Sequence, residues 1–136
     1  MLEFQGEKAP IILGLIALGG ALGALARFGL SYFVQSFHGT NLPLGTLVVN
    51  VLGSFLLGIV GAFVMAHAAE QHLFLRAAVG VGFLGSFTTF STFELENHTL
   101  LSDGQWLAAS AYAGASVFVG LLAVHLGILV GRMLLP

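Results

Sequence analysis

Phe83-Leu-Gly-Ser-Phe-Thr-Thr-Phe-Ser-Thr-Phe93 mixes hydroxyl and phenylalanine side chains directly after several glycines. Hydroxyl side chains occupy five of the seven positions from 86 to 92, and four of the chain's twelve phenylalanines lie between 83 and 93. Because serine and threonine hydroxyls compete for helical backbone groups, the stretch is a poor helix former. We predict a break in a helix here. The alternative is a continuous helix whose hydroxyls bond back to its own carbonyls.

Outside this stretch the chain is strongly apolar. Of its 136 residues, 57% are hydrophobic and 7% are charged, whereas about 25% are charged in a typical soluble protein. Ten charged side chains cannot cover the surface of a water-soluble domain of this size, so the sequence predicts a membrane protein. No basic cluster is present, which argues against nucleic-acid binding. The absence of cysteine excludes disulfides and thiolate chemistry.

The few charges separate uncharged runs of the length that a membrane-spanning helix needs, which is roughly 20 apolar residues. The longest run is divided at its polar segment, residues 36–43. This gives four spans in one all-α domain that covers residues 1–136. The predicted spans are residues 10–34, 44–67, 73–101 and 105–133.

The predicted break lies inside the third span, where lipid offers no partner to free backbone groups. Every amide and carbonyl in the hydrocarbon region needs a partner, so hydroxyls, ions or water must meet the groups that the break releases. Interrupted helices line cavities in membrane proteins and mark ion sites there. The basic residues, with Lys8, Arg76 and Arg132 on one side and Arg27 near the other, weakly favour cytoplasmic termini.

Small residues run along three of the four spans, and helices in lipid approach closely through such stripes. They are Gly19, Gly20, Gly23 and Ala24 in the first span, Gly53, Ser54, Gly58, Gly61 and Ala62 in the second, and Ser110, Gly114, Ser116, Gly120, Gly127 and Gly131 in the fourth. A single four-helix unit does not need so many tight interfaces. We therefore expect a dimer.

Phenylalanines and neutral hydrogen-bond donors are candidates for an anion path. Phe90 and Phe93 are three residues apart, so their rings can share a face, and the edge of an aromatic ring is positively polarised. Hydroxyls and an amide add neutral donors that can replace the water shell of a small, hard anion. The donors on other spans fall at helical spacing: Thr46 with Asn50, and Tyr112 with Ser116.

Each candidate also has a plainer interpretation. Phenylalanines at helical spacing more often pack, and Asn50 can join two helices through a hydrogen bond. Arg27 is either functional or extends its charge to the membrane surface. Glu96 is either an acid at a pore mouth or the mark of a helix end. No phosphate-binding loop, nucleophile elbow or acid–base pair is present, so enzymatic activity is not expected.

Three motifs, in order and on three separate spans, resemble those of the CrcB/Fluc family of fluoride channels. They are Gly20-x-x-Gly-Ala-x-x-Arg-Phe28, Gly45-Thr-Leu-Val-Val-Asn50, and Gly82-Phe-Leu-Gly-Ser-Phe-Thr-Thr-Phe-Ser-Thr-Phe93 with Glu96. The resemblance covers nearly the full chain, and the third motif is close to diagnostic. It implies an antiparallel, dual-topology homodimer in the lipid of a bacterial inner membrane, with two narrow fluoride pores.

The resemblance also implies roles for single residues. Phe90 and Phe93 match the family's paired pore phenylalanines, and Asn50 matches its pore asparagine. Gly85 and Thr89 match the helix break whose backbone carbonyls hold a structural sodium ion, Na+, at the dimer interface. The other positions assigned to the fluoride path are Ser91, Thr92, Glu96, Tyr112, Ser116 and Thr46, with Arg27 in a vestibule or structural role.

Two positions depart from the family pattern. Gly120 lies where some relatives continue the hydroxyl stripe of the fourth helix, and Glu94 adds an acid where serine is common. The resemblance implies passive export of fluoride from the cytoplasm, with neutral dipoles compensating for lost hydration.

Two alternatives are a small four-helix proton-coupled antiporter and a non-transporting subunit of a membrane assembly. The antiporter needs a carboxylate inside the first span, whereas the acids nearest to that span are Glu3 and Glu7, outside its apolar run. The assembly subunit leaves the pattern of residues 83–93 unexplained.

Overall fold

A computed structural model describes residues 8–39, 42–66 and 72–135, and every regular element in these ranges is a helix. Four helical stretches are long and apolar enough to cross a membrane: Ala9–Phe37, Leu44–Ala66, Leu73–Ser102 and Trp106–Met133. The predicted all-α architecture with four spans is confirmed, and the chain is a multi-pass membrane protein. The predicted end of the second span at His67, and the acids Glu3 and Glu7, lie outside the described residues.

Three of the spans are continuous α-helices: α1 (Ala9–His38), α2 (Leu44–Ala66) and α6 (Trp106–Met133). Pro10 lies in the first turn of α1, where its fixed φ suits a helix start. Gly39 ends α1 in the left-handed region, with φ at 46°. The helix therefore continues to residue 38, past the predicted end at residue 34.

The third span is interrupted, as predicted from residues 83–93. It consists of α3 (Leu73–Leu75), the π-helix η1 (Arg76–Leu84), α4 (Gly85–Phe87) and α5 (Phe90–Ser102). Helical geometry is lost at Thr88, with ψ at 156°, and at Thr89, with φ at −148° and ψ at 121°. The break is confirmed, and a continuous third helix is excluded. The wider turns of η1 were not expected.

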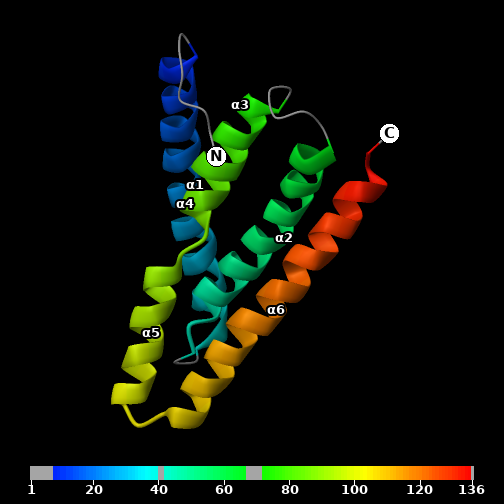
Figure 1. Cartoon of the computed structure of the whole chain (residues 1–136). Coiled ribbons are helices and arrows are strands. Elements are labelled where there is room, and N and C mark those ends of the chain that lie inside the picture. Colours follow the sequence, from blue (N-terminus) through cyan, green and yellow to red (C-terminus); the bar gives the residue numbers. More distant parts are fainter. Residues whose placement is uncertain (1–7, 40–41, 67–71, 136) are drawn as a thin grey trace.

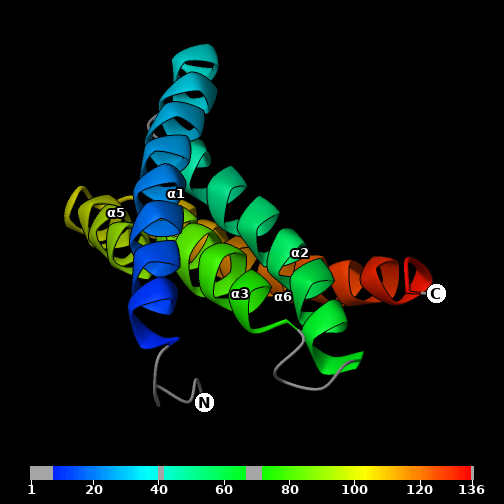
Figure 2. The same ribbon diagram turned by 90° about the horizontal axis from the view of Figure 1, so that it is seen from above.

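The most extensive helix contacts join α2 to α6 and α1 to η1 (Figure 1). Seen from above, α1 runs across the direction of α6 (Figure 2). Glycines bring the paired backbones together. A Cβ on Gly127 would overlap the Phe55 carbonyl, and a Cβ on Gly58 would overlap the Val124 carbonyl. These two glycines therefore serve packing within one chain rather than a dimer contact.

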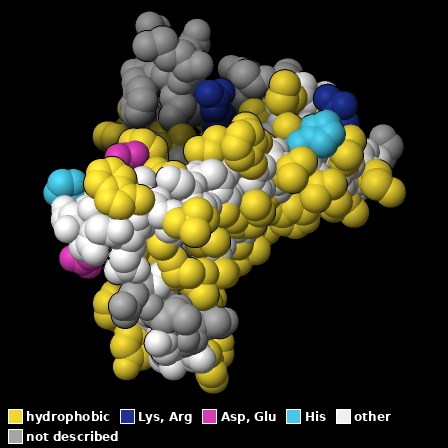
Figure 3. All heavy atoms as spheres, turned by 90° about the horizontal axis from the view of Figure 1, so that it is seen from below, with side chains coloured by type: hydrophobic (Ala, Val, Ile, Leu, Met, Phe, Trp, Pro, Cys, Tyr) yellow, Lys and Arg dark blue, Asp and Glu magenta, His cyan; other side chains and the backbone are white. Residues whose placement is uncertain are grey.

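Many large apolar side chains are exposed among the described residues, and Figure 3 shows one face that carries many apolar and only a few charged side chains. Large exposed side chains include Leu22, Phe28, Phe118 and Leu122. An exposed apolar surface of this extent is unfavourable in water and favourable in lipid. The surface thus agrees with the membrane location that the composition predicted.

Candidate functional site

The helix break is joined to α2 by the side-chain amide of Asn50. Nδ2 of Asn50 donates to the Thr89 carbonyl at 2.9 Å, and the Thr89 amide donates to Oδ1 of Asn50 at 2.8 Å. A continuous helix would direct the Thr89 amide to the carbonyl of Gly85, four residues earlier. The break therefore redirects that amide to a different helix and releases the Gly85 carbonyl from its usual partner.

Threonine hydroxyls satisfy further groups at the break. The Thr88 hydroxyl donates to the Leu84 carbonyl at 3.1 Å, and the Thr89 hydroxyl donates to Oγ1 of Thr92 at 2.9 Å. Oγ1 of Thr89 also accepts the amide of Thr92 at 3.3 Å, so Thr89 caps the start of α5. The hydroxyl-rich sequence thus both ends one helix segment and starts the next.

A cavity of about 270 Å³, here called the phenylalanine pocket, opens beside the break. Its walls include Asn50, Thr88, Thr89, Phe90, Phe93 and Ser116. The centroids of the Phe90 and Phe93 rings lie 5.7 Å apart, with Phe90 73% exposed and Phe93 7% exposed. Among the described residues, no charged side chain lines this pocket. It offers an ion aromatic edges and neutral dipoles.

The hydroxyl oxygen of Ser116 is buried in this region and has no hydrogen-bond partner among the described residues. A buried hydroxyl without a partner is costly. Ser54, one turn beyond Asn50 on α2, adds its hydroxyl to those of Thr88, Thr89 and Ser116 around the same pocket. Ser54 was expected on the Asn50 face of this helix and in its small-residue stripe, but it was not predicted as a pore residue.

Glu96 connects the pocket region to a set of hydroxyls on α2 and α6. Oε1 of Glu96 accepts from the Thr46 hydroxyl at 2.7 Å, and Oε2 accepts from the Tyr112 phenol at 2.7 Å. The ring of Tyr112 lies 5.2 Å from the ring of Phe93, centroid to centroid. Both hydroxyl-bearing residues are buried. The carboxylate of Glu96 therefore accepts hydrogen bonds from two hydroxyl groups. One of them belongs to Tyr112, whose ring contacts Phe93 in the wall of the phenylalanine pocket.

Two further cavities border these groups. One of about 400 Å³, here called the arginine pocket, is lined by residues that include Arg27, Gln35, Thr46, Thr89 and Thr92. Another of about 400 Å³ has Glu96 and Asp103 among its walls and is here called the glutamate pocket. Thr89 lines both the arginine pocket and the phenylalanine pocket. The break thus lies between a cavity with a cation and a cavity without charge.

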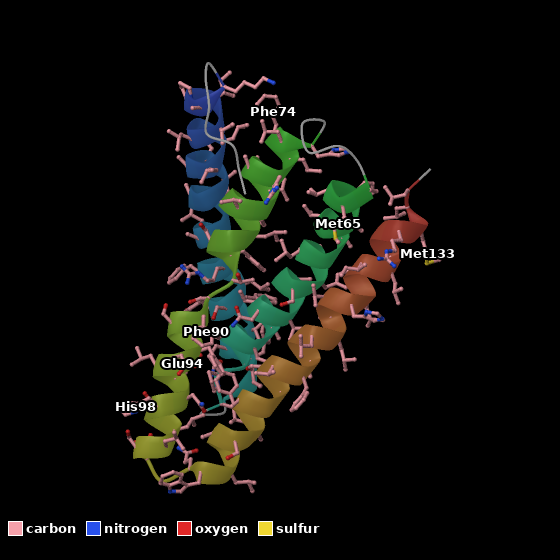
Figure 4. All side chains as sticks on the ribbon, viewed as in Figure 1. Met65, Phe74, Phe90, Glu94, His98 and Met133 are labelled. Carbon is pink, nitrogen blue, oxygen red and sulfur yellow. The ribbon has the colours of Figure 1, made fainter. Side chains whose placement is uncertain are left out.

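The remaining predicted residues are spread around the break. Glu94 is exposed on α5, where Phe90, Glu94 and His98 follow one another at four-residue spacing (Figure 4). Ser91 is exposed on α5 and is not part of the three pockets above. A Cβ on Gly120 would lie 3.8 Å from Oγ of Ser54. At Gly120, therefore, the nearby hydroxyl comes from α2 instead of α6.

Comparison with known proteins gives a consistent result over most of the chain. The family described as CrcB-like protein, Camphor Resistance (CrcB), matches residues 14–128. The fluoride-specific ion channel FluC of Nitratidesulfovibrio vulgaris (strain DSM 19637 / Miyazaki F) is 45% identical over 119 residues, which are 88% of this chain and 95% of the relative. FluC of Shewanella baltica (strain OS185) is 44% identical over 114 residues, 83% of this chain and 90% of the relative. The chain belongs to the CrcB-like family.

Proposed function

We propose that this chain forms a fluoride-selective ion channel that exports fluoride passively from the bacterial cytoplasm across the inner membrane. Its similar relatives are named fluoride-specific ion channels rather than enzymes. The observation that carries the proposal is the phenylalanine pocket, whose walls, in the part of the chain that the structure describes, hold two phenylalanines, an amide and hydroxyls but no charge. The unpartnered Ser116 hydroxyl in its wall supplies a donor for an anion.

Fluoride is small and strongly hydrated, so a pore must compensate for the water that the ion loses. The positively polarised edges of Phe90 and Phe93 do so without a full charge. Ser116 and the remaining N–H of Asn50 add neutral donors. A fixed cation in the narrow part would bind the ion more tightly and slow its release.

The order of the pockets suggests a path for the ion. Arg27 attracts fluoride into the arginine pocket, which reaches Thr92 and Thr89. Fluoride then passes Thr89 to the phenylalanine pocket. From there Tyr112, whose ring contacts Phe93, and Glu96 form the polar continuation toward the glutamate pocket. Thr46 joins Glu96 to the wall of the arginine pocket. Ser91 joins the path from the exposed side of α5 only if a second chain covers it.

A homodimer is part of this proposal because one chain leaves the pocket open. Phe90 is 73% exposed although it is a wall residue. Gly61 and Gly114 have no atom near the position of a Cβ, so they leave room for helices of a second copy. An antiparallel, dual-topology arrangement would place two breaks together and give two pores, with lipid around the dimer.

A sodium ion between the two breaks is also proposed. The residues present fit a hard cation, which prefers oxygen ligands. The Gly85 carbonyl has lost its helical amide to Asn50, and the Thr89 carbonyl accepts one hydrogen bond and keeps a second lone pair. Gly85 is also exposed. When bound, the ion would supply positive charge that neutralises these carbonyl dipoles and joins the two copies.

The two alternatives explain less. A proton-coupled antiporter needs a carboxylate in the first span, and α1 contains no acidic residue from Ala9 to His38. A non-transporting subunit gives no role to the uncharged pocket. Ion efflux from liposomes tests the proposal, because a fluoride channel releases fluoride without matching release of chloride.

A further inference from the structure

We propose that Asn50 is a positioning residue that, together with Gly53, fixes the break of the third span against α2. Asn50 and Gly53 are here called the α2 socket. The inference rests on the proposed fluoride pore and changes the expected part of Asn50 in it. The socket sets where Thr89 and Phe90 lie, and at most one N–H of Asn50 remains for an ion.

The first step is the hydrogen-bond capacity of the asparagine amide. The group has one oxygen acceptor and two N–H donors. Oδ1 accepts the Thr89 amide at 2.8 Å, and Nδ2 donates to the Thr89 carbonyl at 2.9 Å. Both polar backbone groups of one residue are thus bound by one side chain. This pairing fixes the orientation of Thr89 as well as its distance from α2.

The hydroxyls of the break are bonded to other groups. The Thr88 hydroxyl is bonded to the Leu84 carbonyl, and the Thr89 hydroxyl is engaged with Thr92. Thr89 is also extended, so its amide and carbonyl no longer point along a helix axis. The α2 socket therefore replaces the helical partners that the break removes from Thr89, as lipid-buried backbone requires.

Gly53 supplies the second contact of the socket, one turn after Asn50. A Cβ at Gly53 would overlap Cγ2 of Thr88 and lie 3.1 Å from Cδ1 of Phe87. Only a residue without a side chain lets the break approach α2 this closely. Asn50 binds one extended residue of the break, and Gly53 accommodates the other. The two contacts together determine both the position and the direction of the chain as it enters α5.

The pore follows from this placement because Phe90 comes directly after Thr89. Thr89 lines both the arginine pocket and the phenylalanine pocket, and Phe90 lines the latter. A change in the socket moves the wall of both cavities at once. Asn50 thus acts on fluoride chiefly through Thr89 and Phe90.

The test is solvent exchange of the Thr89 amide, measured by NMR on the full-length protein in lipid nanodiscs, with fluoride efflux measured in parallel. Asn50→Leu removes both hydrogen bonds. Its Thr89 amide is expected to exchange about tenfold faster or more, as loss of one hydrogen bond implies. Ser116→Ala is the matched control, because Ser116 lines the same pocket and its hydroxyl oxygen has no hydrogen-bond partner among the described residues. It is expected to lower efflux and to leave this exchange unchanged.

Asn50→Asp distinguishes the two hydrogen bonds, because it keeps one and removes the other. It is also the test variant if Asn50→Leu fails to fold. The carboxylate still accepts the Thr89 amide but cannot donate to its carbonyl. We expect slow amide exchange together with a shifted ¹³C signal of the Thr89 carbonyl. Gly53→Ala is expected to speed exchange as Asn50→Leu does.

Reduced efflux with wild-type exchange in Asn50→Leu, or an unchanged carbonyl signal in Asn50→Asp, would overturn the positioning role and leave Asn50 as an ion ligand only. The NMR measurements do not require fluoride transport. Failure of the fluoride proposal and failure of the socket are therefore separate outcomes.

Discussion

The phenol of Tyr112 on α6 donates a 2.7 Å hydrogen bond to Oε2 of Glu96 on α5. Tyr112→Phe removes this donor and keeps the ring that contacts Phe93. Because Glu96 then loses one of its two hydroxyl partners, we expect a stability loss of about 1–3 kcal/mol. Thermal unfolding in detergent measures this loss, and fluoride efflux is expected to fall as well.

Tyr32→Phe is the matched control for Tyr112→Phe. Tyr32 is the chain's other tyrosine, is 72% exposed and stacks on Phe28. Its substitution is expected to change the free energy of unfolding by less than about 0.5 kcal/mol. Equal losses in the free energy of unfolding for the two substitutions would show that the hydrogen bond to Glu96 does not stabilise the protein.

Ser116 provides a substitution that separates function from stability. Its buried hydroxyl oxygen has no partner among the described residues, so Ser116→Ala breaks no protein hydrogen bond. We expect the unfolding temperature to stay the same or to rise slightly. Fluoride efflux is expected to fall by about tenfold, which corresponds to a rise of roughly 1.4 kcal/mol in the activation free energy. Ser110→Ala, at an exposed site on α6, is the control. Unchanged efflux in Ser116→Ala would remove this hydroxyl from the path.

The contact between α2 and α6 predicts a purely structural effect. Gly127→Ala places a methyl group against the Phe55 carbonyl and should cost about 1–3 kcal/mol through forced separation of the two helices. Gly29→Ala, within α1, meets no atom within 4 Å and is the control, because Gly29 is assigned to no helix contact in the subunit or between subunits. Unfolding measurements on both variants check the prediction. Equal stabilities would contradict the close packing described at Gly127.

Sodium removal tests the proposed metal site. Replacing all sodium with potassium at constant ionic strength should lower both the thermal stability of the dimer and its fluoride efflux, because a ligand that binds only the folded assembly stabilises it. Restoring sodium should restore both properties. If neither the thermal stability nor the fluoride efflux changes when potassium replaces sodium, the proposed sodium site is wrong.

The four spans and the break could be predicted from the sequence because both depend on local composition. Apolar runs between rare charges set the spans, and the hydroxyl-rich residues around Thr88 and Thr89 set the break. The π-turns of η1 could not be predicted, since no local pattern distinguishes a helix with i→i+5 bonds. The π-helix η1 has its most extensive contacts with α1, which lies far from it in the sequence.

The sequence predicted which residues belong to the site better than it predicted the hydrogen bonds that join them. Phe90 and Phe93 meet in one pocket, as their spacing suggested. The pairing of Asn50 with Thr89 joins residues 39 positions apart, which no local pattern encodes. The orientations of the two acidic side chains of α5 could not be predicted from the sequence either. Glu96 turns toward Thr46 and Tyr112, whereas Glu94 is exposed, and that difference depends on the register of α5 after the break.

The most direct test of the central claim is paired efflux from liposomes loaded with fluoride or with chloride, followed by ion-selective electrodes. The purified protein should release fluoride rapidly and chloride little, and Phe90→Ile should slow fluoride release without unfolding, since Phe90 is exposed in the single chain. Equal release of both anions, or no fluoride release from folded protein, would contradict the account.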